Sequence, residues 1–127
     1  MIKRTIDIDG YWKVIVYFNV NYNLFPYILK DLRKVTHSEK LVKRLYYNMN
    51  NNIAKGVTIS NIEKHISVVL FNPHKEMYDY INTIAHEAEH IKQDMLRAYN
   101  VYDAGEPPAY TIGYLMMKML MIFDKLS

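Results

Sequence analysis

The chain has 127 residues, a length typical of one domain, and its balance of 50% apolar and 23% charged residues excludes a disordered or fibrous protein. It contains no cysteine, so disulfide scaffolds, thiolate zinc sites and cysteine nucleophiles are excluded, and any metal must be bound by histidine and carboxylate side chains. The formal net charge of +3 is too weak to make nucleic acid an expected partner.

The first half of the chain predicts one strand, two helices and a hairpin. Residues 12–20 are rich in β-branched and aromatic side chains, which predicts the first strand. Residues 24–35 and 38–49 predict two helices, the second capped by Thr36 or Ser38. Two short β-rich runs, Gly56 to Ser60 and His65 to Phe71, predict a hairpin because only four residues separate them.

The second half predicts two helices. The segment from His74 to about Tyr99 contains no glycine or proline. Its apolar residues recur every three or four positions, as on one face of a helix: Met77, Ile81, Ile84, Ala88, Ile91 and Met95. After a turn at 103–108, residues 109–125 predict a final apolar helix. The order of elements indicates a single α+β domain over residues 1–127, with helices packed on a small sheet.

Two segments indicate where in the cell the protein is expected. Asp7 and Asp9 interrupt the N-terminal apolar stretch that a signal peptide requires. The apolar part of the final helix, residues 112–123, contains Lys118 and is shorter than the ~20 residues that cross a membrane. We therefore expect a cytoplasmic protein without a membrane partner.

The residues with the clearest chemistry form an HExxH motif, His86-Glu87-Ala88-Glu89-His90, in the middle of the long predicted helix. Residues four apart on a helix lie on one face, so His86 and His90 are placed to share one zinc ion. Glu87 is displaced to the side of the pair, where a carboxylate suits a base that acts on metal-bound water. The alternative is a solvated polar face, because Asp79, Gln93 and Arg97 lie in the same sector of the helix.

A catalytic zinc ion needs a third protein ligand, and no histidine follows His90. The ligand must then be a carboxylate, with Asp94, Asp103 and Glu106 as candidates. We choose Glu106, because it opens the next predicted helix and a helical hairpin returns it toward the pair. Its alternative role is in a capping box with Asp103.

The predicted helix after Glu106 offers two further features. Ala109 and Gly113 lie on the side that carries Glu106, and such small residues allow two helices to approach closely. Tyr110, one turn after Glu106, is a candidate to polarise a substrate carbonyl with its hydroxyl, or else a core residue.

This arrangement, His86-Glu87-x-x-His90 followed by Glu106-x-x-Ala109-Tyr110-x-x-Gly113, resembles the gluzincin metallopeptidases. In length the chain is similar to their minimal members, the minigluzincins, and to short proteins of phages and bacterial mobile elements. The resemblance covers residues 83–114. It implies a zincin-like fold, in which a small sheet with a strand or hairpin precedes the HExxH helix and a glutamate-bearing C-terminal helix follows it.

The resemblance also implies an activity, hydrolysis of peptide bonds in a peptide or protein substrate. His86, His90 and Glu106 would bind Zn²⁺, and Glu87 would activate the attacking water. An exposed sheet edge, near residues 65–71 or 56–60, would pair with an extended substrate.

Two other classes of function stay open. Glu89 adds a charge within the motif, and Pro107 and Pro108 disfavour helical backbone at Glu106, so a zinc-binding but non-hydrolytic regulatory or interaction protein on a degenerate zincin scaffold is the alternative. A basic run in the helices at 30–44 is the only feature in favour of nucleic-acid binding, and such runs are usually solvated faces.

Overall fold

The computed structural model describes residues 1–101 and 105–125, and the side chains of Glu106 and Pro107 lie outside the description. The strands are β1 (Ile2–Ile8), β2 (Trp12–Phe18), β3 (Gly56–Asn61) and β4 (Ile66–Phe71). The α-helices are α1 (Phe25–Leu32), α2 (Glu39–Asn50), α3 (Met77–Ala98) and α4 (Glu106–Asp124), and a short 3₁₀ turn, Tyr22–Leu24, precedes α1.

The four strands form one mixed sheet in the order β1-β2-β4-β3. β1 pairs antiparallel with β2, and β3 pairs antiparallel with β4 in the predicted hairpin. β2 and β4 run parallel, and the long crossover connection that a parallel pair needs contains α1, α2 and β3. β3 is therefore an edge strand, while β4 is interior. Of the two segments expected to offer a free edge, only residues 56–60 do so.

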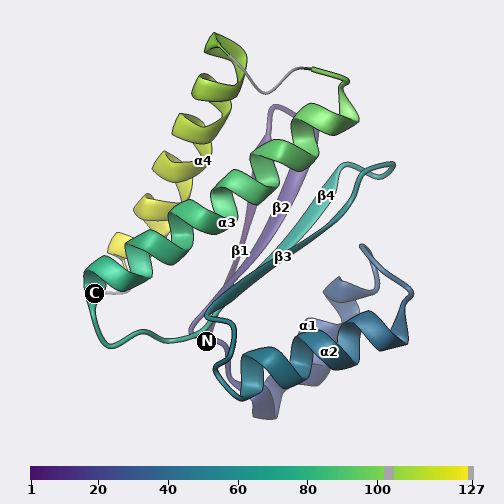
Figure 1. The fold of residues 1–127 in the computed structure, drawn as a ribbon, viewed down its shortest axis with the longest axis vertical. Helices are drawn as coiled ribbons and strands as arrows, with labels where there is room; N and C mark the ends of the chain where they lie inside the picture. The colour runs from purple at the N-terminus through teal and green to yellow at the C-terminus, as the bar shows by residue number, and fades with distance from the viewer. Residues whose placement is uncertain (102–104, 126–127) are drawn as a thin grey trace.

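The sheet lies between two pairs of helices, with α1 and α2 on one face and α3 and α4 on the other (Figure 1). Each face has its own core. Beneath α3 and α4, Phe18, Phe71, Ile84 and Leu115 are fully or almost fully buried. Beneath α1 and α2 the core contains the following buried side chains: Ile15, Tyr17, Val20, Ile28, Leu32, Val35, Val42, Leu45, Met49, Val68 and Leu70. Burial on both faces explains the nearly continuous apolar sequence of β2 and β4.

Most of the predicted elements are confirmed, with shifted ends. Ser38 caps α2, because its side chain accepts a hydrogen bond from the Leu41 amide. α3 begins at Met77 rather than at His74, and Met77 is exposed, not in the core. The first strand of the chain, β1, is absent from the prediction. Its sequence is mostly polar and only Ile6 is buried, so it lacks the apolar alternation of a typical strand.

α4 begins earlier than predicted, at Glu106. Gly105 is its N-cap residue and has a φ angle of +85°, a conformation that glycine adopts without strain. Pro107 and Pro108 then fall in the first turn, where a helix needs no amide donors. The double proline thus fits the start of the helix and leaves Glu106 as a helical residue. Within the described residues, no helix is long and apolar enough to cross a membrane.

Candidate metal centre and its cleft

The two histidines of the HExxH motif converge on the exposed side of α3. The Nε2 atoms of His86 and His90 are 3.1 Å apart, and their rings meet edge to face with centroids 4.7 Å apart. Two Zn–N bonds of 2.0–2.1 Å at a tetrahedral angle place the nitrogens about 3.3 Å apart. The pair therefore has the separation that two zinc ligands require, and both imidazoles are open to solvent.

Glu87 lies between the histidines and the sheet. Its side chain is buried, with 4% of the residue exposed, and it forms no salt bridge with a lysine or arginine of the described residues. The Thr58 hydroxyl of β3 donates a hydrogen bond to Glu87 Oε1 over 2.8 Å. Burial raises the pKa of Glu87 above its ordinary value, while the bond from Thr58 and the nearby His90 and His86 oppose that rise. A carboxylate so placed is suited to accept a proton at the edge of the site.

Gly56 brings the start of β3 against α3. A Cβ atom at this position would lie 2.8 Å from Thr83 Cγ2 and 3.1 Å from Glu87 Cγ, closer than packed carbons approach. Only glycine therefore fits between strand and helix here. Gly56, Thr83, His86 and Glu87 line one cleft, which runs between the β3 edge and α3. Of the motif, His86, Glu87 and Glu89 line this cleft, and His90 is exposed beside it.

Glu89, the charged residue within the motif, has partners on its own helix. Its Oε1 atom pairs with Lys92 Nζ over 2.7 Å and also accepts a hydrogen bond from Gln93. Because Lys92 balances the charge, the structure gives Glu89 a partner on its own helix. Glu89 also lines the cleft.

The three candidates for the third ligand have different positions. Asp94 accepts a hydrogen bond of 2.6 Å from Ser60 and is turned toward β3. Asp103 lies outside the described residues. Glu106 is the first residue of α4, and only its backbone is described. Figure 1 shows the N-terminal end of α4 standing apart from the middle of α3, where the two histidines lie. Among the described side chains, no three metal-binding groups converge.

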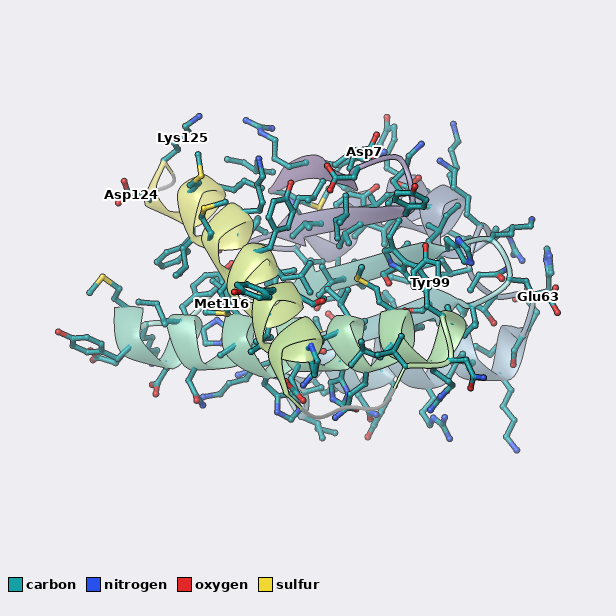
Figure 2. All side chains as sticks on the ribbon, turned by 90° about the horizontal axis from the view of Figure 1, so that it is seen from above. Asp7, Glu63, Tyr99, Met116, Asp124 and Lys125 are labelled. Atoms are coloured by element: carbon teal, nitrogen blue, oxygen red, sulfur yellow. The ribbon has the colours of Figure 1, made fainter. Side chains whose placement is uncertain are left out.

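Tyr110 lies in a different part of the molecule. It is 73% exposed and lines a second pocket, together with Ala109, Gly113 and Met95. Figure 2 shows α4 crossing α3 rather than running along it. A Cβ atom on Gly113 would meet no atom of the described residues within 4 Å. The prediction that this small residue allows close helix packing is therefore wrong, and the catalytic role of Tyr110 stays a prediction from the sequence.

Sequence reasoning missed the contribution of β3 to the site. Gly56, Thr58 and Ser60 alternate with Val57 and Ile59, and this pattern of period two predicts a polar strand face. In the structure that face meets α3, where Thr58 and Ser60 bond to carboxylates. The sequence alone predicts a polar face on β3. It does not predict that this face contacts α3, because that contact depends on the strand order.

Comparison with known proteins assigns this geometry to no established group, since no family model, curated protein or solved structure matches the chain.

Proposed function

We propose that the protein is a zinc-dependent metallopeptidase of the gluzincin type, with a zincin-like fold. His86 and His90 would hold the metal, and Glu106 is the predicted third ligand. The observation that carries the proposal is the pair of Nε2 atoms 3.1 Å apart beside a buried glutamate. The position of β3 as an edge strand whose first residue, Gly56, lines the same cleft supports it, because an extended peptide can pair with such an edge.

The chemistry would be divided between the metal and the protein. Zinc, when bound, supplies a Lewis acid that polarises a peptide carbonyl and makes water more acidic. Glu87 accepts a proton from the attacking water while the water oxygen bonds to the carbonyl carbon. When the carbon–nitrogen bond breaks, Glu87 returns that proton to the amine that leaves. The backbone of β3 beside Gly56 would align the substrate along the cleft.

A peptide library tests this function, because it covers many cleavage sequences at once. The zinc-loaded protein is incubated with an equimolar mixture of peptides, and mass spectrometry identifies new termini. We expect cleavage by the wild type and a loss of about 10²–10⁴-fold in Glu87→Gln with zinc retained, because the amide cannot act as a base. Glu63→Gln is the matched control, since this exposed carboxylate lies at the β3–β4 turn, labelled in Figure 2, and is not among the residues that line the cleft.

Two outcomes contradict the peptidase. Cleavage that persists at the wild-type rate in Glu87→Gln would come from another protein or another mechanism. Stoichiometric zinc without any cleavage across the library would favour the alternative, a non-hydrolytic zinc protein that regulates or binds a partner.

A further inference from the structure

Two hydrogen bonds of the same kind join β3 to α3. The Thr58 hydroxyl donates to Glu87 Oε1 over 2.8 Å, and the Ser60 hydroxyl donates to Asp94 Oδ2 over 2.6 Å. Both hydroxyls come from the same face of the edge strand, and both carboxylates come from the same face of the helix. They differ in one respect, because only the first bond holds the carboxylate of the HExxH motif.

The surroundings of Glu87 leave its carboxylate little freedom. Oε1 is bonded to Thr58, and Oε2 lies 3.4 Å from the place that a Cβ atom would take on Gly56. The residue is almost fully buried, so few water molecules compete for the same oxygens. Oε1 has a hydroxyl donor, whereas Oε2 has no hydrogen-bond donor among the described residues and is the oxygen with both acceptor sites open.

We propose that Thr58 is the positioning residue for Glu87, and that its hydroxyl fixes Oε1 so that Oε2 acts as the base toward the cleft. This inference rests on the proposed peptidase, since it assigns the orientation of that enzyme's base. The Thr58 hydroxyl is directed at Glu87, at its carboxylate and its backbone carbonyl, rather than at either histidine, so its role is distinct from zinc binding. The hydroxyl, rather than the methyl group, carries the role.

Ser60 provides the matched control for Thr58. Its bond to Asp94 also ties β3 to α3, and its hydroxyl further contacts Ser67, whose own hydroxyl accepts a bond from the Trp12 indole. Removing the Ser60 hydroxyl therefore loosens the same pair of elements without changing a bond to Glu87. Any loss of rate that follows from loosened packing alone will appear in Ser60→Ala as well as in Thr58→Val.

The test compares zinc-loaded wild type, Thr58→Val, Thr58→Ser and Ser60→Ala on the peptide that the wild type cleaves fastest in the library. Because a misaligned base slows the chemical step, we expect kcat to fall about 10-fold or more in Thr58→Val with KM within about 2-fold. Thr58→Ser should recover most of the rate, since it keeps the donor. Ser60→Ala should keep kcat within about 2-fold, although its melting temperature falls like that of Thr58→Val. All four proteins should hold equal zinc.

Several results would overturn the inference. An unchanged kcat in Thr58→Val, or equal losses in Thr58→Val and Ser60→Ala, would reduce Thr58 to a packing residue. Loss of zinc in Thr58→Val would mean that the substitution acts through metal binding rather than through the orientation of Glu87. A wild type that cleaves no peptide would remove the proposed function and this role together, whereas an active wild type with an active Thr58→Val removes this role alone.

Discussion

At the scale of single residues, the packing of β3 against α3 depends on a position that has no side chain. That position is Gly56, where the absence of a Cβ atom leaves the space that Thr83 and Glu87 occupy. The backbone of Gly56 has an ordinary negative φ angle, so the constraint is steric rather than conformational.

We expect Gly56→Ala to lower the free energy of unfolding by about 1–3 kcal/mol, since the new methyl group would lie 2.8 Å from Thr83 Cγ2. Urea denaturation measures the change. Gly113→Ala is the control, because its added Cβ would have no neighbour within 4 Å in the part of the chain that the structure describes. In the interior of α4 that substitution should raise stability by about 0.5–1 kcal/mol. Equal effects at the two glycines would contradict the close approach of β3 to α3.

At the scale of elements, a buried aspartate ties the first helix to the sheet. Asp31 of α1 is 3% exposed and contacts Lys3 of β1 over 2.8 Å and Lys34 over 3.0 Å, and it accepts a hydrogen bond from the Tyr17 hydroxyl of β2. Lys34 belongs to the basic run at 30–44, in which Arg33 also pairs with Glu39. Two residues of that run, Arg33 and Lys34, therefore form ion pairs within the protein.

The pairing of Asp31 makes its contribution dependent on pH. Burial is the largest influence and favours the neutral acid, but the bonds from Lys3, Tyr17 and Lys34 outweigh it and lower the pKa below 3.8. Because the folded pKa is lowered, the stabilisation is complete above the unfolded pKa and is lost as pH falls through the folded pKa.

We therefore expect Asp31→Asn to cost about 2 kcal/mol at pH 7, where the carboxylate is charged in both states of the chain. The difference from wild type should shrink as the pH falls below 3.8. Unfolding curves for the two proteins at several pH values measure it. A difference that stays constant, or grows toward acid, would show that the charge of Asp31 does not contribute.

The elements also show which part of the structure could be predicted. The hairpin, α2 and α3 follow from local signals, namely β-branched runs, the Ser38 cap and apolar spacing. The His86–His90 pair follows from helix geometry alone. β1 could not be predicted because it buries only Ile6 and depends on β2 for its pairing. The contacts of Thr58 and Gly56 depend on the strand order, which local sequence does not encode.

At the scale of the whole molecule, zinc would couple binding to folding, because α3 holds His86 and His90 one turn apart with their Nε2 atoms 3.1 Å apart, and the unfolded chain does not hold that spacing. We expect the melting temperature of the wild type to rise with added zinc and to fall on chelation. At a zinc concentration 100 times the Kd, the stabilisation is about 2.7 kcal/mol. His90→Ala should show no such response. A zinc-dependent rise that is equal in His90→Ala would place the metal elsewhere.

In the proposed site His86, His90 and Glu106 bind one zinc ion, and elemental analysis of the purified protein measures that ion itself. The wild type is measured beside His90→Ala and Glu106→Ala after the same reconstitution. The proposal predicts about one zinc per chain in the wild type, none in His90→Ala and weakened binding in Glu106→Ala. Absence of zinc from the reconstituted wild type would contradict it and leave the histidines as a polar face of α3.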